Sequence, residues 1–228
     1  MRQLFMIILS ITTFFGVCVA GENPAPKDEK FRTSYSVGYE VGGDLKSKGV
    51  DVNSGVLLEG VEDAMKANEP LLTRQEMRNI LSDLQKKIIS AQEQKTKAEA
   101  EKNLSEGKAF LAENSTKQGV KVLPSGLQYR VIKEGSGKTP KADNTVTVHY
   151  KGTLINGTEF DSSFKEGKPA TFRADHVIAG WKEALQLMKE GSKWQLFVPP
   201  QLAYGERRTG RIGPNSTLIF EIELISVN

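Results

Sequence analysis

A segment of about forty residues with no proline and almost no glycine limits the folds open to this chain. It begins at a capping box, Thr73-Arg74-Gln75-Glu76, in which the threonine and glutamate side chains can each accept a backbone N–H at a helix start. No proline follows before Pro124, and Gly107 is the only glycine before Gly119. The pattern predicts one helix over residues 74–114, which at 1.5 Å per residue is roughly 60 Å long.

The two halves of this expected helix differ in composition. The first half carries apolar residues at alternating spacings of four and three, which predict a packing seam: Met77, Leu81, Leu84, Ile88 and Ala91. Residues 92–103 have no large apolar side chain, so we expect water to surround them. Phe110 and Leu111 are expected to dock the helix end to the next part of the chain. Gly107 and residues 115–119 are candidate hinges.

Two shorter helical patterns precede the long helix, in a region spanning residues 31–72. The first has Gly38 and Gly42 on its apolar stripe, which lets another helix approach closely; the second starts at Asn53, a residue type favoured as an N-cap. So small a region buries little apolar surface by itself. We therefore expect residues 31–72, with the first half of the connecting helix (73–114), to form a homodimer. A monomeric three-helix bundle is the alternative.

The first twenty residues have the layout of a secretory signal peptide. Arg2 gives a positive start, residues 4–20 carry no charge, and small residues precede a cleavage point before Gly21. We expect residues 1–20 to be cleaved and the polar residues 21–30 to be a disordered leader. Two alternatives stay open. One is an uncleaved membrane anchor, since the apolar stretch is near the shortest that spans a bilayer; the other is a lipoprotein acylated at Cys18.

The composition excludes several classes of function. With 31 Lys and Arg against 28 Asp and Glu, the net charge of +3 is too balanced for a nucleic-acid binder that relies on a basic face. One cysteine and two histidines exclude a cysteine-based metal cluster and a histidine-rich metal site. The motifs HExxH and GxSxG and the P-loop are absent. We therefore expect no metal and no cofactor.

The hydrophobic period changes after residue 115. Strands are predicted where the pattern alternates, a hairpin turn at Asn156-Gly157, and one helical run that Gly191 closes. The expected strands cover 127–133, 145–150, the residues around 158–160, 194–198 and 217–227, and the expected helix covers 181–188. Residues 115–228 are thus expected to form an α+β domain, an antiparallel sheet crossed by a short helix.

Aromatic residues come from six separate segments of this domain: Tyr150, Phe160, Phe172, Trp181, Tyr204 and Phe220. By residue type alone they could all be core. They could instead line an apolar pocket. The hydroxyl of tyrosine and the indole N–H of tryptophan need hydrogen-bond partners when buried, and a pocket can leave these groups accessible.

Five blocks containing these residues resemble a known family. In chain order they are Tyr150, Phe160-Asp161-Ser162-Ser163, Val177-Ile178-x-Gly180-Trp181, Ala203-Tyr204-Gly205 and Thr217-Leu218-Ile219-Phe220. Their order and spacing resemble the FKBP-type peptidyl-prolyl isomerases. The helical region and the linker from residue 122 to 129 are similar to the macrophage infectivity potentiator (Mip) group, with FkpA-like bacterial chaperones as near relatives.

The resemblance implies a site as well as a fold. The implied fold is an FKBP-like antiparallel sheet wrapped on a short helix, behind an all-α dimerisation region. The implied catalytic residues are Tyr150, Phe160, Asp161, Trp181, Tyr204 and Phe220. The implied substrate-binding residues are Val177, Ile178, Phe172 and Ile212. The loop over residues 206–214 overhangs the site in the family, and its three arginines either tune substrate choice or are merely solvated.

The resemblance also implies a function. It implies a peptidyl-prolyl cis–trans isomerase that assists the folding of secreted or periplasmic proteins, without a covalent step. The implied partners are proline-containing polypeptides and rapamycin-type macrolide inhibitors. The location would be the periplasm or the outer membrane and cell surface. The alternative function is a dimeric holdase chaperone whose isomerase activity is incidental.

Overall fold

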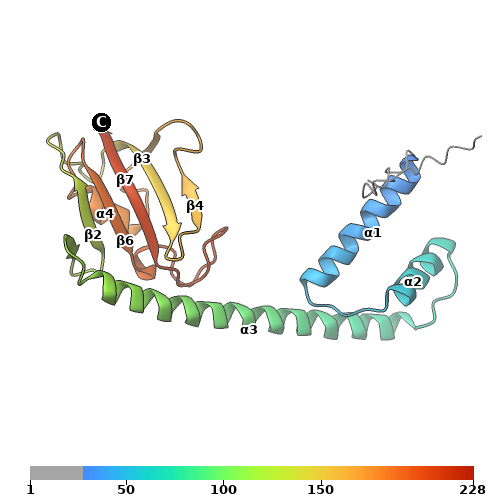
Figure 1. Cartoon of the computed structure of the whole chain (residues 1–228). Helices are drawn as coiled ribbons and strands as arrows, with labels where there is room; N and C mark the ends of the chain where they lie inside the picture. Colours follow the sequence, from blue (N-terminus) through green and yellow to red (C-terminus); the bar gives the residue numbers. More distant parts are fainter. Residues whose placement is uncertain (1–27) are drawn as a thin grey trace, which may run out of the picture. The chain divides into compact units, whose positions relative to one another are not determined.

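The computed structural model describes residues 28–228, and the chain divides into two compact units at Met77 and Arg78 (Figure 1). The expected signal peptide, and the leader up to residue 27, lie outside the described residues. Within residues 28–228 no helix is long and apolar enough to cross a membrane.

The first unit contains the helices α1 (Glu29–Ser47) and α2 (Ser54–Lys66). The Asp28 side chain accepts a hydrogen bond from the backbone N–H of Lys30, so α1 begins two residues before the expected Phe31. Asn53 caps α2 by accepting from the backbone N–H groups two and three residues further on, at 2.9 and 3.2 Å. Within the single described chain, neither helix has a buried residue.

The long helix α3 (Arg74–Asn114) runs unbroken over the predicted range. Its capping box has formed, because the backbone N–H of Glu76 donates to Thr73 Oγ1 at 3.2 Å and the N–H of Thr73 donates to Glu76 Oε2 at 2.9 Å. These hydrogen bonds hold the pKa of Glu76 below its usual value. The local signals therefore account for both the start and the length of this helix.

The second half of α3 differs from what its polar composition predicts. Water does not surround residues 92–103 on all sides, because Glu99 and Asn103 contact the 206–216 segment of the following domain. Gly107 is buried against Thr217, so this position is a tight contact and not a hinge. Polar side chains attach this stretch of helix to the domain, and a test for apolar periodicity does not detect such a surface.

The domain after α3 is a seven-stranded antiparallel sheet with one short helix. The strands are β1 (Val120–Val122), β2 (Gln128–Lys133), β3 (Thr145–Leu154), β4 (Glu159–Ser162), β5 (Ala170–Arg173), β6 (Lys193–Val198) and β7 (Leu218–Val227). Their order is β1-β2-β6-β7-β3-β4, and β5 also pairs with β3. The sequence patterns did not predict β1 and β5, which have three and four residues. β4 is also four residues long, but the turn at Asn156-Gly157 indicated it.

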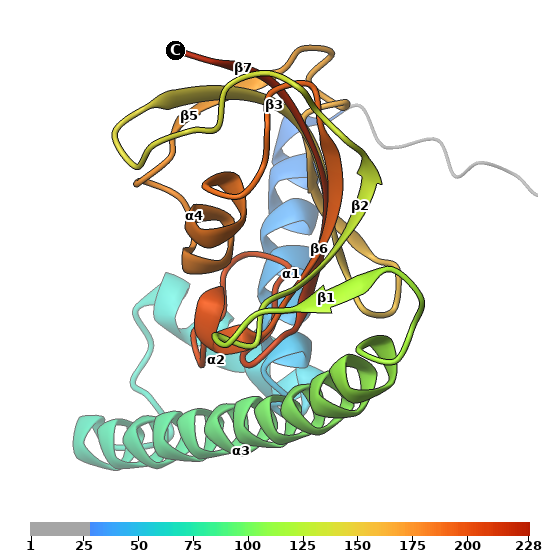
Figure 2. The same cartoon turned by 90° about the vertical axis from the view of Figure 1, so that its left-hand side faces the viewer.

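The helix α4 (Ala179–Leu185) lies against the concave face of this sheet (Figure 2). It ends three residues before the expected Met188. Alternate residues of β7 are fully buried or nearly so, which matches the period of a strand with one face on a core: Leu218, Phe220, Ile222 and Leu224. The core therefore lies between the sheet and α4, and the segment that leads into α4 opens onto the end of that core.

Candidate active site

A pocket of about 460 Å³ lies where the lead-in to α4 meets the sheet. The strands β3, β4, β5 and β7, the N-terminal end of α4 and the loop after residue 202 all contribute to it. The lining residues are Tyr150, Phe160, Asp161, Phe172, His176, Val177, Ile178, Trp181, Ala203, Tyr204, Arg207 and Phe220. Most of these side chains are apolar or aromatic, as in pockets that take small ligands or peptide side chains.

Trp181 is the central aromatic side chain of the pocket. It sits in the first turn of α4 and is 4% exposed. Three other rings meet it edge to face, with centroids 5.3 Å away for Tyr150, 5.9 Å for Phe172 and 5.3 Å for Phe220. Edge-to-face contacts of this kind are favourable and fix the angle between the rings. The floor of the pocket is therefore rigid and apolar.

Phe160 completes the aromatic wall. Its ring meets Phe220 edge to face at a centroid distance of 5.6 Å. Both rings press on the backbone of Gly152, where a Cβ atom would come within 2.7 Å of Phe160 and 2.9 Å of Phe220. A glycine in β3 thus allows two aromatic side chains to approach the sheet closely.

Asp161 supplies a fixed carboxylate at the edge of the pocket. Its Oδ2 accepts a 2.7 Å hydrogen bond from the Tyr150 hydroxyl, and its Oδ1 accepts one of 2.9 Å from the backbone N–H of Ser162. Burial, and then the hydrogen bond and charge of Asp161, raise the pKa of the Tyr150 phenol. Tyr150 therefore stays protonated and keeps this carboxylate in one orientation.

The buried indole N–H of Trp181 has no acceptor within residues 28–228. Two further donors on the pocket lining, a phenol and a backbone amide, also have none. One is the hydroxyl of Tyr204. Burial, and then the charge of Asp161, raise the pKa of this phenol above its usual value. The other is the backbone N–H of Ile178, the N-cap residue of α4. Both groups are placed on the pocket lining, where a carbonyl oxygen of a bound peptide could accept from them.

The structure brings together all the expected site residues except Ile212. That side chain is 4% exposed and packs into the hydrophobic core, and its backbone pairs with Thr209 across a tight hairpin. His176, Ala203 and Arg207 also line the pocket, although sequence reasoning did not select them. His176 and Ala203 adjoin or belong to the matched blocks, so proximity in sequence was a usable signal for these two.

No group of three or more histidine, cysteine, aspartate or glutamate side chains in residues 28–228 is placed to hold a metal ion. The pocket offers apolar surface, the Asp161 carboxylate, the side chains of His176 and Arg207, and donors such as the Tyr204 hydroxyl and the Ile178 N–H. Such a set can bind and distort an uncharged group such as an amide, and it holds no paired nucleophile and base.

Comparison with known proteins agrees with this arrangement. A family described as "FKBP-type peptidyl-prolyl cis-trans isomerase" matches residues 136–225. A second, described as "Domain amino terminal to FKBP-type peptidyl-prolyl isomerase", matches residues 30–131. The crystal structure of FkpA from Escherichia coli is similar with a TM-score of 0.72 and 37% identity, covering 90% of this chain and 99% of that one.

Two curated relatives are similar over most of their length. "Outer membrane protein MIP" of Legionella longbeachae is 50% identical over 200 residues, which is 87% of this chain and 86% of that protein. "Peptidyl-prolyl cis-trans isomerase Mip" of Coxiella burnetii is 42% identical over 228 residues, covering 100% of this chain and 99% of that protein.

The antiparallel sheet wrapped on a short helix and its aromatic pocket are those of a peptidyl-prolyl isomerase domain. The chain belongs to the FKBP-type peptidyl-prolyl cis–trans isomerases, of the Mip and FkpA kind. It is therefore an isomerase that acts on proline-containing polypeptides. The comparisons do not favour the holdase alternative over this activity.

Proposed function

We propose that the peptidyl-prolyl bond rotates in the aromatic pocket, with the proline ring against Trp181. The observation that carries this proposal is the edge-to-face contact of three rings with that indole, which gives an apolar floor of fixed shape. A proline ring is apolar and flat enough to lie there. Its preceding carbonyl would then lie near the Tyr204 hydroxyl and the Ile178 N–H.

Rotation about the bond requires the loss of amide resonance, a barrier of about 18–20 kcal/mol. The twisted amide has a pyramidal nitrogen and a less polar carbonyl than the planar form. An apolar pocket excludes water that would otherwise solvate the planar amide, so it favours the twisted state relative to the planar one. No covalent intermediate and no cofactor are needed.

The polar groups are proposed to hold the chain on either side of the rotating bond. The backbone N–H of Ile178 and the hydroxyl of Tyr204 would each donate to a substrate carbonyl, since both lack an acceptor in the described chain. Asp161, held by Tyr150, would face the rotating amide with its orientation fixed. Bound in the same pocket, a rapamycin-type macrolide would compete with substrate.

The test is the rate of cis–trans exchange of a short X–Pro peptide by the full chain. We expect Tyr204→Phe to lower kcat/KM by about five- to tenfold, the effect of losing one hydrogen bond of about 1 to 1.4 kcal/mol. The control is Tyr129→Phe, because Tyr129 is buried and stacks on Trp194 at 4.4 Å, away from the pocket. Equal rates for Tyr204→Phe and this control would contradict the proposed role. Failure of a macrolide to inhibit the wild type would contradict the shared site.

We also infer that the N-terminal helices form a homodimer. The support is that α1 and α2 bury no residue within one described chain, while large apolar side chains such as Leu58 and Met65 are 63% and 83% exposed. On α1 the exposed rings of Phe31, Tyr35 and Tyr39 stack in a row. Short helices with bare apolar faces are marginal in water, and a second copy would cover them.

Export from the cytoplasm is a further proposal, with the enzyme in the periplasm or at the outer membrane, assisting the folding of exported proteins. The support is the signal-like pattern of residues 1–20 and the name of the Legionella longbeachae relative, "Outer membrane protein MIP". Sequencing the N-terminus of the protein recovered from the producing cell tests it. A start at Gly21 is expected, and a start at Met1 would contradict cleavage.

A further inference from the structure

The second half of α3 holds the segment 206–216 through side chains on two of its turns. Glu99 forms an ion pair with Arg208, on the outgoing arm of that segment. Asn103 donates from Nδ2 to the backbone oxygen of Pro214 at 2.8 Å and lies 3.4 Å from Ser216 Oγ, on the returning arm. All these residues belong to the second compact unit. Side chains of one helix therefore contact both ends of the loop that residues 206–216 form.

Close packing accompanies these polar contacts. Gly213 is buried against the helix, and a Cβ atom there would lie 2.9 Å from Asn103 Nδ2 and closer still to Glu99 Oε1. Gly107, one turn further along α3, is as tightly packed against Thr217 at the end of the loop. The lack of side chains at these two glycines brings the helix and the loop into direct contact.

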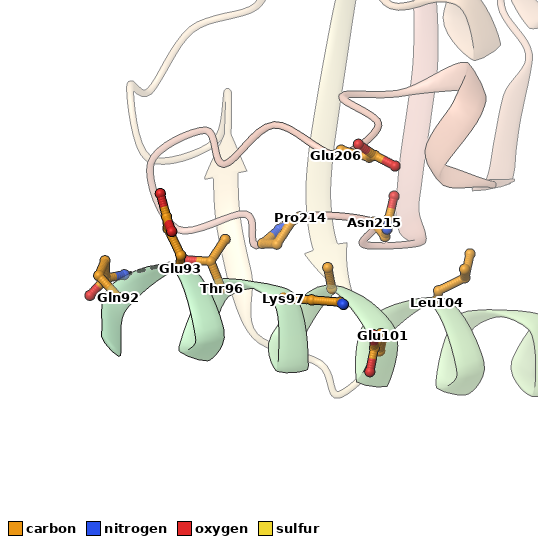
Figure 3. A pocket seen from close by; sticks show the side chains of 10 residues that line it. Gln92, Glu93, Thr96, Lys97, Glu101, Leu104, Glu206, Pro214 and Asn215 are labelled. Atoms are coloured by element: carbon orange, nitrogen blue, oxygen red, sulfur yellow. Dashed lines mark hydrogen bonds between the residues drawn. The ribbon is translucent and has the colours of Figure 1, made fainter. Parts of the chain in front are cut away.

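A groove lies beside this contact and is not filled by protein. Its volume is about 570 Å³, and it lies between the loop and a neighbouring face of α3 that includes the turns of Glu99 and Asn103 (Figure 3). Residues from Gln92 to Leu104 line one side, and Glu206, Pro214 and Asn215 line the other (Figure 3). The loop thus has free space on this side, and the contacts of Glu99 and Asn103 fix its position.

The same loop carries part of the active pocket. Arg207, the immediate neighbour of Arg208, lines the pocket and donates from its backbone N–H to the oxygen of Tyr204 at 3.3 Å. Tyr204, two residues before the segment, also lines the pocket. The loop is closed at its base by a 2.7 Å hydrogen bond from the N–H of Asn215 to the oxygen of Gly205, and its tip is closed by the pairing of Thr209 with Ile212. Because the loop is closed at both levels, a shift at Arg208 should also shift Arg207 and, through the hydrogen bond between their backbones, Tyr204.

We propose that Glu99 and Asn103 are positioning residues for the isomerase reaction. From α3 they hold the loop in the arrangement that places Tyr204 and Arg207 at the pocket, although neither side chain reaches the pocket itself. The proposal rests on the pocket being the site of catalysis. It makes the second half of the connecting helix a functional part of the isomerase domain and not a spacer between two folded regions.

The expected effect is a change in substrate binding more than in the chemical step. When only a fraction of molecules has the loop in place, the apparent affinity falls by that fraction, while bound substrate restores the arrangement. The side chains of the Glu99–Arg208 ion pair are 37% and 47% exposed, so the pair contributes little to the free energy of unfolding. Reversing one charge is therefore expected to raise KM about fivefold and to leave kcat within about a factor of two.

The experiment compares charge reversals in the full chain, with an uncharged X–Pro peptide as substrate. Glu99→Lys and Arg208→Glu should each raise KM, and the double variant should restore it to within about twofold of wild type, because the pair is re-formed with opposite signs. The matched control is Glu101→Lys, which makes the same charge change on the same helix beside the groove and should leave KM unchanged. Salt should raise KM for the wild type and not for Glu99→Lys, since ions screen an attractive pair.

Asn103→Ala is the second variant. It removes the donor to Pro214 without a change of charge and should also raise KM. The inference is overturned when Glu99→Lys behaves like Glu101→Lys, or when the double variant shows the sum of both single losses. Failure of the proposed function looks different, because Tyr204→Phe would then turn over as fast as wild type whatever the α3 variants do.

Discussion

The Tyr150 hydroxyl donates a 2.7 Å hydrogen bond to Asp161 across the β3–β4 ladder, at the edge of the aromatic pocket. Gly152 pairs with Asp161 in that ladder, so Tyr150, two residues along β3, lies on the same face of the sheet. The contact unites the polar and aromatic parts of the site: one ring packs edge to face on Trp181 and, through its hydroxyl, orients the carboxylate. Because the donor is an ionisable phenol, the contribution of this hydrogen bond to stability should depend on pH.

Tyr150→Phe should destabilise the protein by about 1 kcal/mol at neutral pH, because a hydrogen bond to a partly exposed carboxylate is lost. The pKa of the Tyr150 phenol is raised in the folded protein, so its contribution is fully present below the usual tyrosine pKa of about 10. As the pH rises above that value, the phenol ionises first in the unfolded chain, and the contribution is lost. Denaturant unfolding of both proteins between pH 7 and pH 11 measures the difference.

The difference between wild type and Tyr150→Phe should therefore shrink above pH 10. Other ionisable groups are common to both proteins and cancel in the comparison. A difference that stays constant or grows with pH would show that the hydroxyl does not donate to Asp161 in the folded state.

Gly107→Ala should destabilise the protein, although alanine is the better helix former by about 1 kcal/mol. The added Cβ would overlap Thr217 Oγ1, and overpacking of a buried site costs about 1–3 kcal/mol. We expect a net loss of about 1 kcal/mol in the free energy of unfolding, measured by urea titration.

Thr217→Ala provides the test of that explanation. The Thr217 hydroxyl is buried and has no hydrogen-bond partner in the described chain, so its removal leaves no unpaired group behind. In a Thr217→Ala background, Gly107→Ala should cost less, because the closest contact is removed and only the Cβ of residue 217, at 3.2 Å, remains near the new methyl group. If its cost is the same in both backgrounds, the overlap is not the cause and Gly107 is needed for another reason.

Local signals predicted the helices well and the docking of α3 poorly. The capping box acts within a few residues and fixes the start of α3 at Arg74, and the absence of proline allows the helix to continue to Asn114. The ion pair of Glu99 with Arg208 joins residues 109 positions apart and has no periodic signature. For the same reason residues 92–103 were predicted to be solvated, although one face of them holds a loop.

The site itself was largely predictable, through the matched blocks and not through residue type. Tyr150, Trp181 and Phe220 are all buried or partly buried, so burial alone would not distinguish a pocket from a core. Ile212 is the residue for which the expectation was wrong. It lies in the loop that overhangs the pocket, but its side chain turns into the core, and only the tertiary structure reveals that orientation.

Leu58→Glu should convert the proposed homodimer to monomers. Leu58 is exposed in one chain, so a glutamate at this position should not destabilise a monomer. Burying its charge against a second copy costs free energy and should weaken dimerisation. Sedimentation should change from about twice the chain mass of 25.1 kDa, or of the cleaved form, to the mass of one chain. Turnover of a short peptide per chain should stay the same, because Leu58 is outside the isomerase unit.

The control for the dimer is Lys86→Glu, on α3 away from the apolar seam. It loses only an exposed ion pair with Asp83, which contributes little, and should remain dimeric. Monomeric wild-type protein at micromolar concentration would contradict the dimer directly.

Gly152→Ala should reduce both the activity and the stability of the protein. The new methyl group would meet the rings of Phe160 and Phe220 at 2.7 and 2.9 Å, and because those rings form the pocket wall they must move away from the sheet. We expect kcat/KM for an X–Pro peptide to fall at least about tenfold, with a loss of about 1–3 kcal/mol in the free energy of unfolding.

Gly157→Ala is the matched control, since it destabilises without touching the pocket. Gly157 has a φ of +85° in the β3–β4 turn and open space around it, so alanine there costs about 1 kcal/mol through backbone strain alone. Its turnover should equal that of wild type. Equal activity losses in the two variants would mean that general loosening, and not displacement of the two rings, lowers the rate. A loss confined to Gly152→Ala would tie catalysis to the packing of Phe160 and Phe220 on the sheet.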